Sequence, residues 1–350
     1  MPPDSLALLR PDDWHVHLRD GAMMRAVLPF TARSFGRAIV MPNLVPPVTT
    51  AAAAESYRAR IVAALPAGAR FTPLMTCYLT DETDPDDVER GFRAGVVAAV
   101  KLYPAHATTN SAAGVTDVAR VAPVLERMAA LGMPLLVHGE VTDPDVDVFD
   151  REAVFIDRVL APLVARLPAL KVVLEHVTTS EGVAFVTASG ANVAATITAH
   201  HLVLNRNALF AGGLRPHAYC LPVAKREEHR RALRRAATSG AAGFFLGSDT
   251  APHPVADKER DGGCAGIFSA PAALAIYARV FEEERALDRL ETFAAVNGAR
   301  FYGLPVASER VRLERRPWRV PETVATAAGP VQPFLAGETL DWQMAAPEEA

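Results

Sequence analysis

The stretch Trp14-His15-Val16-His17-Leu18-Arg19 decides how the rest of the chain is interpreted. In a β-strand alternate side chains share a face, so His15 and His17 would project together while Val16 would point into apolar packing. Two imidazole groups on one face can bind one metal ion. A His-x-His pair is short, however, and two histidines can also lie on an ordinary strand as inert, hydrogen-bonded side chains. The metal interpretation therefore depends on what the other strands contribute.

Short apolar segments, many of them ending in a polar residue and followed by a helical pattern, recur along the chain. This is how a parallel barrel appears in a sequence. The predicted strands are residues 13–17, 37–42, 71–78, 96–101, 134–138, 171–176, 192–198 and 243–249. The predicted helices between them are residues 50–65, 85–94, 118–131, 152–167, 180–188 and 226–237.

Eight strands alternating with helices predict an α/β fold, a (β/α)8 TIM barrel. In that fold the active site lies at the carboxyl ends of the strands. The chain has ligand-type residues at several of those ends. They are His15 and His17 on the first predicted strand, Lys101 on the fourth, His138 on the fifth, His176 on the sixth and Asp249 on the eighth. We therefore expect these six side chains to converge.

The length of 350 residues suits one large barrel domain, since half of the residues are hydrophobic and can form a sizeable core. We predict a single domain over residues 1–350, with the barrel core at about 10–300. Residues 271–285 and 290–298 look helical, and the chain beyond them contains several prolines without a clear period. Residues 301–350 are expected to form a C-terminal extension that packs on the barrel and carries no chemistry.

Charge and cysteine content argue against several kinds of partner. The formal net charge of −4 and the pI near 6.2 leave no basic surplus for phosphates, so nucleic acid is not expected as a partner. No apolar run is long enough to span a bilayer, and residues 1–10 show no targeting signal, so no membrane association is expected. Three widely spaced cysteines predict neither a disulfide framework nor a zinc ribbon, which favours a reducing, cytoplasmic location.

The four histidines, the aspartate and the lysine are too many ligands for one catalytic zinc, which usually takes three protein ligands. They suit two divalent cations, which repel each other at about 3.5 to 4 Å and therefore need an anion between them. Lys101 could supply that anion only after losing its proton and reacting with carbon dioxide to give a carbamate. A lysine that reaches solvent or holds a substrate phosphate is also compatible with the spacing.

Longer motifs surround these residues. They are Asp13-Trp14-His15-Val16-His17-Leu18-Arg19-Asp20, Met41-Pro42-Asn43, Lys101-Leu102-Tyr103-Pro104-Ala105, Val137-His138-Gly139-Glu140, Glu175-His176, Gly247-Ser248-Asp249-Thr250-Ala251-Pro252-His253 and Gly263-Cys264-Ala265-Gly266. In this order they resemble the motifs of the dihydroorotases, in the monofunctional bacterial type (class II) of the amidohydrolase superfamily. The resemblance covers nearly the whole chain, up to residues 334–338. Seven ordered motifs are far more specific than one His-x-His pair.

The resemblance implies a site with two Zn²⁺ ions per subunit. The implied ligands are His15 and His17 for one ion, His138 and His176 for the other, N6-carboxylated Lys101 as the bridge, and Asp249 completing the first. A bridging hydroxide would attack the ring amide of L-dihydroorotate and give N-carbamoyl-L-aspartate, with Asp249 as general acid and base. In cells the reverse, ring-closing direction serves de novo pyrimidine (UMP) biosynthesis. The resemblance also implies a homodimer.

The same resemblance implies how the substrate is held. Its carboxylate needs cationic or donor partners outside the metal shell, and backbone groups contact the pyrimidine ring. A mobile loop at residues 107–111 would close over the substrate with two threonines. The implied substrate-binding residues are Arg19, Asn43 and His253 for the carboxylate, Leu221 and Ala265 for the ring, Thr108 and Thr109 for the loop, and His138.

Two other functions stay open at this point. Another cyclic amidohydrolase, such as a hydantoinase or an allantoinase, shares the same ligand set, although Arg19, Asn43 and the two threonines favour dihydroorotate. A non-catalytic dihydroorotase-like barrel would be expected to have lost ligands, and all six are present here. His200 and His201 follow the seventh predicted strand. Because the resemblance gives them no metal role, we interpret them as structural residues or as residues that support the metal ligands from outside the metal shell.

Overall fold

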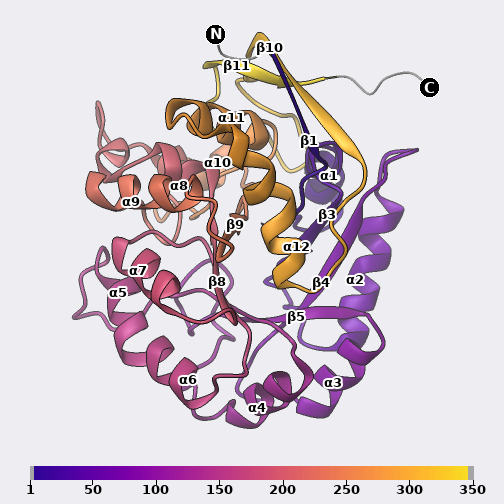
Figure 1. Cartoon of the computed structure of the whole chain (residues 1–350), viewed down its shortest axis with the longest axis vertical. Coiled ribbons are helices and arrows are strands. Elements are labelled where there is room, and N and C mark those ends of the chain that lie inside the picture. The colour runs from indigo at the N-terminus through magenta and orange to yellow at the C-terminus, as the bar shows by residue number, and fades with distance from the viewer. Residues whose placement is uncertain (1–3, 346–350) are drawn as a thin grey trace.

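An eight-stranded parallel sheet forms the centre of the computed structural model, which describes residues 4–345 (Figure 1). Each strand of this sheet pairs in parallel with the next one along the chain. In order, the strands are β2 (Asp13–Val16), β3 (Arg37–Val40), β4 (Thr72–Tyr78), β5 (Val97–Leu102), β6 (Leu135–Val137), β7 (Val172–Leu174), β8 (Val193–Ile197) and β9 (Phe244–Leu246). Each one overlaps a strand predicted from the sequence.

The sheet closes on itself where β2 meets the chain that follows β9. The amide of Asp249 donates to the carbonyl of His15 at 2.9 Å, and the amide of His17 donates to the carbonyl of Thr250 at 3.0 Å. Val16 and Thr250 form a parallel bridge at the same place. The predicted (β/α)8 barrel is therefore confirmed, and the carboxyl ends of its first and last strands lie side by side.

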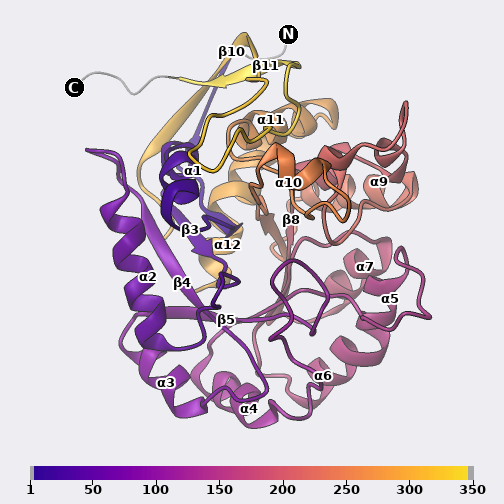
Figure 2. The same ribbon diagram turned by 180° about the vertical axis from the view of Figure 1, so that it is seen from behind.

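Helices surround the barrel and connect successive strands, as Figures 1 and 2 show from opposite sides. Several predicted helices form as expected: α2 (Ala51–Ala63), α3 (Pro85–Arg93), α4 (Ala122–Leu131), α7 (Ser180–Ala188) and α9 (Glu227–Ala237). The helix predicted at 152–167 is interrupted, because a π-helical turn, Ile156–Leu160, separates α5 (Arg151–Phe155) from α6 (Ala161–Arg166). In the later part of the chain, α11 (Ala273–Glu283) matches the helical pattern at 271–285.

Helix α1 (Gly21–Ser34) lies in a region where the sequence pattern predicts no helix. Asp20 caps its first turn by accepting a hydrogen bond from the first helical amide at 2.8 Å. Pro29 lies inside the helix, where a proline removes one backbone hydrogen bond. The helix nevertheless forms because it buries an apolar face that includes Met24 and Leu28.

The interior of the barrel is filled by an apolar layer to which each barrel strand contributes. Its members are Trp14, Ile39, Leu74, Ala99, Leu136, Val173, Ala194 and Phe245. Helix α12 (Asn297–Phe301) crosses this end of the barrel (Figure 1). Gly298 packs so closely there that a Cβ atom would lie 2.0 Å from Nε1 of Trp14. This end is therefore closed, and the polar strand ends lie at the other.

A β-bulge in β2 separates the apolar layer from the histidines. The pairing of β2 with β3 gains one residue between Asp13 and Val16. Trp14 consequently joins the interior layer, whereas Val16 packs in the outer cluster that includes Leu28 of α1. Simple alternation would place Trp14 and Val16 on the same face. The bulge is what allows His15 to follow Trp14 into the barrel interior.

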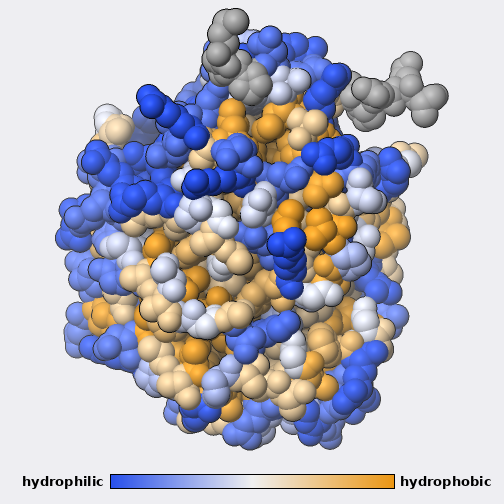
Figure 3. All heavy atoms as spheres, viewed as in Figure 1, coloured by the Kyte–Doolittle hydropathy of each residue, from blue (hydrophilic) through white to orange (hydrophobic). Residues whose placement is uncertain are grey.

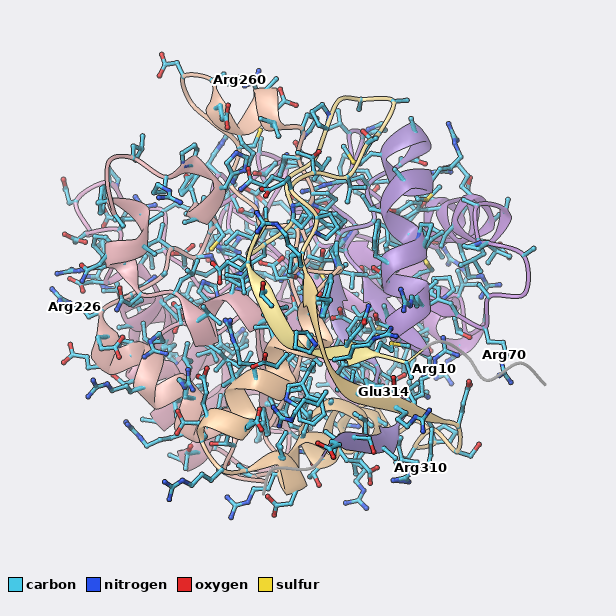
Figure 4. All side chains as sticks on the ribbon, turned by 90° about the horizontal axis from the view of Figure 1, so that it is seen from above. Arg10, Arg70, Arg226, Arg260, Arg310 and Glu314 are labelled. Carbon is cyan, nitrogen blue, oxygen red and sulfur yellow. The ribbon has the colours of Figure 1, made fainter. Side chains whose placement is uncertain are left out.

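A three-stranded antiparallel sheet lies outside the barrel, at the top of Figures 1 and 2. It consists of β1 (Ser5–Leu9), β10 (Arg310–Arg319) and β11 (Thr339–Met344), with β10 in the middle. Arg310 and Glu314 mark the middle strand in Figure 4. The sequence pattern predicts no strand here, because β10 is rich in arginine and only one of its 10 residues is buried. The division into a barrel core and an extension stays a prediction.

In Figure 3 polar and charged residues lie mostly around the rim of the face, and more apolar residues lie over its middle. Large exposed apolar residues include Phe210 and Leu214. Single exposed apolar side chains of this kind are normal on a protein surface. Within residues 4–345, no helix combines the length and the apolar character needed to cross a bilayer.

Candidate metal centre

Three side chains from the first and last barrel strands converge at the carboxyl end of the barrel. The Nε2 atoms of His15 and His17 lie 3.2 Å apart. Oδ1 of Asp249 lies 3.3 Å from Nε2 of His15 and 3.1 Å from Nε2 of His17. All three residues are buried. Two ring nitrogens and a carboxylate oxygen at these separations form a ligand set for a divalent transition metal.

The other ring nitrogens of these two histidines face side-chain oxygen atoms, which leaves Nε2 available to bind a metal. Nδ1 of His17 lies 2.9 Å from Oδ1 of Asn43, an atom that only accepts, so Nδ1 carries the proton. Nδ1 of His15 lies 3.1 Å from Oε2 of Glu175 but has no hydrogen-bond partner within residues 4–345. A hydrogen-bond partner such as Asn43 fixes the tautomer and the orientation of a metal-binding histidine. Burial lowers the pKa of His17 to about 4, so its ring is neutral at pH 7.

His138 and His176 form a second group beside the first. Their ring centroids are 4.8 Å apart, and the ring of His176 lies 5.1 Å from that of His15. Nε2 of His138 lies 2.8 Å from Oε2 of Glu140, which leaves Nδ1 of that ring for a ligand. Within residues 4–345, the buried Nδ1 atom of His176 has no hydrogen-bond partner. A buried polar atom without a partner is costly, which suggests that a ligand belongs there.

Lys101 extends from β5 into the same region and is completely buried. Its Nζ atom forms an ion pair with Oε2 of Glu175, the atom that also contacts His15. Burial lowers the pKa of Lys101, and the negative charges of Glu175 and Asp249 oppose that shift. A lowered pKa favours the neutral amine, which is the form that reacts with carbon dioxide. The alternative in which Lys101 reaches solvent is wrong, because the side chain is fully enclosed.

Three residues of the site have left-handed backbone conformations. The φ angle is 60° at Arg19, 43° at His176 and 46° at Asp249. Each residue comes shortly after a barrel strand ends. A non-glycine residue with a positive φ is uncommon, and such strain costs on the order of 1–3 kcal/mol. The strain is located where side chains must turn towards one point, as is typical of functional sites.

A cavity at this end of the barrel brings most of the predicted site residues together. The predicted residues that line it are His15, His17, Arg19, Asn43, Thr108, Thr109, His138, His176, Leu221, Asp249 and Ala265. Two predicted residues are not part of its wall. Lys101 is fully buried, and His253 lines an adjacent small cavity.

Arg19 and His253 are paired next to this cavity. Nη2 of Arg19 donates to Nε2 of His253 at 2.8 Å, and Nε of Arg19 donates to the carbonyl of Pro252 at 3.1 Å. Burial, together with the positive charge of Arg19, lowers the pKa of His253, so its ring is neutral and can accept that hydrogen bond. In the part of the chain that the structure describes, no carboxylate forms an ion pair with Arg19. Its guanidinium is therefore suited to an anionic ligand.

The predicted loop at residues 107–111 lies against both walls of the cavity. Oγ1 of Thr109 donates to the carbonyl of Ala265 at 3.3 Å. Nδ2 of Asn43 donates to the carbonyl of Thr109 at 3.1 Å, and Nδ2 of Asn110 donates to the carbonyl of Asn43 at 3.0 Å. These bonds hold the two threonines at the cavity. The mobility of the loop stays a prediction.

The sequence pattern assigns no role to three charged residues that lie around the site. Glu140 and Glu175 contact His138 and His15. Each of these carboxylates lies within two residues of a predicted ligand, and that proximity is a signal that could have identified them. Lys258 lies in the short helix α10 (Val255–Glu259), within a polar and glycine-rich segment that carries no such signal.

A separate buried group also has possible ligand atoms within 4.8 Å of one another, namely those of His200, His201 and Cys220. Both ring nitrogens of His201 already have protein partners. Nδ1 lies 2.9 Å from Oγ1 of Thr198, and Nε2 lies 3.0 Å from the carbonyl oxygen of Pro222. These hydrogen bonds support the structural interpretation of His201.

Known proteins similar to this chain share nearly its whole length. The model of the amidohydrolase family matches residues 13–311. The dihydroorotase of Erythrobacter litoralis is 62% identical over 341 residues, which are 97% of this chain and 99% of that relative. The dihydroorotase of Novosphingobium aromaticivorans is 60% identical over 343 residues, which are 98% of this chain and 99% of that relative.

Solved structures show the same relationship. Dihydroorotase from Saccharomyces cerevisiae, in complex with 5-fluoroorotic acid, is 35% identical with a TM-score of 0.91, covering 98% of this chain and 99% of that chain. Dihydroorotase from Campylobacter jejuni is 36% identical with a TM-score of 0.89, covering 98% of each chain. An L-hydantoinase from Arthrobacter aurescens is 17% identical with a TM-score of 0.81, covers 97% of this chain and 83% of that chain, and shares the fold alone. This chain therefore belongs to the amidohydrolase family and, within it, to the dihydroorotases.

Proposed function

We propose that this protein is a zinc-dependent dihydroorotase, which interconverts N-carbamoyl-L-aspartate and L-dihydroorotate in de novo pyrimidine biosynthesis. The observation that carries the proposal is the convergence of two histidine groups around a buried lysine, in a cavity that also presents Arg19 and Asn43. The family membership of the chain supports the same reaction.

The donor set fits two Zn²⁺ ions. His15, His17 and Asp249 would hold one ion, because their ligand atoms converge within 3.3 Å. His138 and His176 would hold the other. Nδ1 of His176 has no hydrogen-bond partner within residues 4–345, and the contact of His138 with Glu140 uses Nε2 of that ring. When bound, the ions would polarise the ring amide carbonyl and make a water molecule acidic enough to attack it.

N6-carboxylated Lys101 is proposed as the bridge between the two ions. In the modification, the neutral amine forms a bond to the carbon of carbon dioxide and releases one proton, which gives a carbamate with one negative charge. The buried position of Lys101 and the lowered pKa of its amine support this step. The two oxygens that share this charge would then lie between the metal groups, and the negative charge would favour the binding of two cations.

Asp249 is proposed as the general acid and base. Its histidine neighbours lower the pKa of its carboxyl group despite burial, so the carboxylate is ionised at neutral pH. In the hydrolytic direction this carboxylate would take the proton of the attacking water and deliver it to the ring nitrogen as the amide bond breaks. In the ring-closing direction the same carboxylate would remove the proton from the carbamoyl nitrogen.

The substrate would be held by charge at one end and by backbone groups along its ring. Arg19, Asn43 and His253 are proposed to bind the carboxylate, since the guanidinium of Arg19 is positively charged and forms no ion pair with a carboxylate of residues 4–345. Leu221 and Ala265 would contact the ring through backbone atoms. Thr108 and Thr109 would cover the substrate, which excludes water during the reaction.

The test is hydrolysis of L-dihydroorotate by the purified protein, followed by ultraviolet absorbance, beside hydantoin and allantoin and before and after chelation. We expect turnover of dihydroorotate alone, lost on chelation and restored by zinc. Turnover of hydantoin or allantoin instead would identify another cyclic amidohydrolase. No turnover by protein that contains metal would favour a non-catalytic barrel.

The assembly and the location of the protein are proposed from the family resemblance. We propose a homodimer, which sedimentation equilibrium of the purified protein would test. We also propose a cytoplasmic location, which fractionation of the source cells would test.

A further inference from the structure

Lys258 is a buried cation whose three donor protons are all used by backbone carbonyl groups. The residue lies in α10 and is 4% exposed. Its Nζ atom donates to the carbonyl oxygens of Tyr219 at 2.8 Å, Cys264 at 2.9 Å and Gly266 at 2.7 Å. In the described part of the chain, no carboxylate forms an ion pair with it. Its Nζ atom also lies 5.7 Å from the centroid of the Tyr219 ring, but its hydrogen bonds all go to the main chain.

The three carbonyl groups belong to two segments that form part of the wall of the cavity. Tyr219 comes two residues before Leu221, and Cys264 and Gly266 flank Ala265. Leu221, Ala265 and Gly266 all line the cavity beside the candidate metal centre. The amide of Gly266 also donates to the carbonyl of Tyr219 at 3.1 Å. Lys258 therefore joins two segments that are far apart in the sequence and adjacent at the site.

The bond to Cys264 also orients the amide group of Ala265. The carbonyl of one residue and the N–H of the next belong to one rigid peptide plane, and in a trans peptide they point in opposite directions. Anchoring the carbonyl of Cys264 thus fixes the direction of the Ala265 N–H. The backbone of Gly266 is closely packed against its neighbours, because a Cβ atom built there would lie only 2.8 Å from the carbonyl oxygen of Ala251. Gly266 also has a φ of 147°, which favours glycine. This close packing limits how far the segment can shift.

We propose that Lys258 is a positioning residue for ring recognition, which holds segments 219–221 and 264–266 in the conformation that binds the pyrimidine ring. This inference rests on the proposed function. The side chain acts through the backbone of its neighbours and does not contact the substrate. Burial lowers the pKa of Lys258 to about 8, so the ammonium form with its three donors still predominates at pH 7.

The test compares Lys258→Met with Arg260→Met in the complete, zinc-loaded protein. Arg260 lies just beyond α10 and is labelled in Figure 4, is exposed, and pairs with Asp257 at 3.8 Å. Its loss removes a positive charge from the same segment without removing any bond to the carbonyl groups. The measurements are kcat and KM for dihydroorotate, the Kd for orotate, and the zinc content.

For Lys258→Met we expect KM and the Kd for orotate to rise by about tenfold or more, while kcat changes by less than about threefold and zinc content is unchanged. For Arg260→Met we expect wild-type values of all four quantities. An unchanged KM in Lys258→Met would overturn the proposal, and so would an equal rise in Arg260→Met, since general attraction of the anionic substrate would then explain both. A wild-type protein that does not turn over dihydroorotate would instead refute the proposed function.

Lys258→Gln provides a second variant in case Lys258→Met does not fold. Glutamine keeps two donor protons on a shorter, neutral side chain, so we expect a smaller rise in KM than for Lys258→Met. If neither variant folds, Lys258 is needed for the fold itself, and a separate role in ring recognition is overturned.

Discussion

Nδ1 of His17 lies 2.9 Å from Oδ1 of Asn43, and this contact joins the candidate metal centre to the loop that covers the cavity. The side-chain amide of Asn43 donates from its other end to the carbonyl of Thr109 at 3.1 Å. One side chain therefore sets the tautomer of a candidate metal ligand and holds a residue proposed to close over the substrate. Metal binding and loop position are expected to depend on each other through Asn43.

Asn43→Ala is expected to lower the affinity for zinc by about tenfold to a hundredfold, because loss of the partner of a metal-binding histidine typically has that effect. Competition with a chromophoric chelator measures the affinity. Asn110→Ala is the matched control, since it removes only the hydrogen bond from the loop to the backbone of Asn43. Equal zinc affinity in the wild type and in Asn43→Ala would show that Asn43 does not orient His17.

Lys101→Ala is expected to lower kcat/KM by at least about a thousandfold, because the bridge between the two ions is lost. Added short-chain carboxylic acids such as acetate should restore part of the activity by occupying the position of the carbamate. Lys171→Ala serves as the control, since Lys171 immediately precedes β7 at the opposite end of the barrel. Full activity of Lys101→Ala without added acid would contradict the proposed bridge.

Arg19→Gln is expected to raise the KM for dihydroorotate by about tenfold to a hundredfold, because hydrogen bonds to charged groups contribute about 1.5–3 kcal/mol. The zinc content should stay at the wild-type value, since Arg19 contacts His253 and Pro252 rather than a candidate metal ligand. Arg33→Gln, at an exposed position of α1, should leave the KM unchanged. Zinc loss in Arg19→Gln would mean that Arg19 supports the metal centre instead.

His200 is expected to make the stability of the metal-free protein dependent on pH. Burial lowers its pKa to about 4, and its side chain is fully enclosed. The unfolded chain therefore binds a proton between about pH 6.5 and 4 that the folded chain does not, so the free energy of unfolding falls as the pH falls through this range. At pH 5 the contribution of His200 is a loss of about 2 kcal/mol relative to pH 7.

Urea unfolding in the presence of a chelator, at pH 7 and pH 5, measures this dependence. His200→Gln should lose less stability than the wild type between the two pH values, whereas His106→Gln, at an exposed position, should behave as the wild type. Identical losses in the wild type and in His200→Gln would show that His200 is not responsible.

The barrel strands were predictable because parallel strands buried on both faces appear as short apolar segments, such as Leu135–Val137 and Val172–Leu174. Strand β10 was not predictable in this way, since most of its side chains face outward. Helix α1 escaped prediction because Pro29 interrupts its pattern. The bulge in β2 is likewise absent from the sequence pattern, because it is defined only by pairing with β3.

The site was predictable where chemistry and position coincide, as for His138 and Asp249 at strand ends. The structure brings those residues together around one cavity. The roles of Glu175 and Lys258 depend instead on residues far away in the sequence. Lys101 is 74 residues from Glu175, and Tyr219 is 39 residues from Lys258. A hydrogen bond between distant segments has no periodic signal, so only the folded chain reveals it.

The place where the barrel closes would give the candidate metal centre a mechanical role. His15 lies in the strand that begins the cylinder, His17 directly follows that strand, and Asp249 follows the strand that ends the cylinder. Only a few backbone contacts join these two edges, including the bonds of Asp249 to His15 and of His17 to Thr250. An ion bound by all three side chains would cross-link the first strand to the chain that follows the last strand. The ion that supports the chemistry would then also stabilise the closure of the barrel. Loss of the metal would therefore loosen the first and last strands before the others.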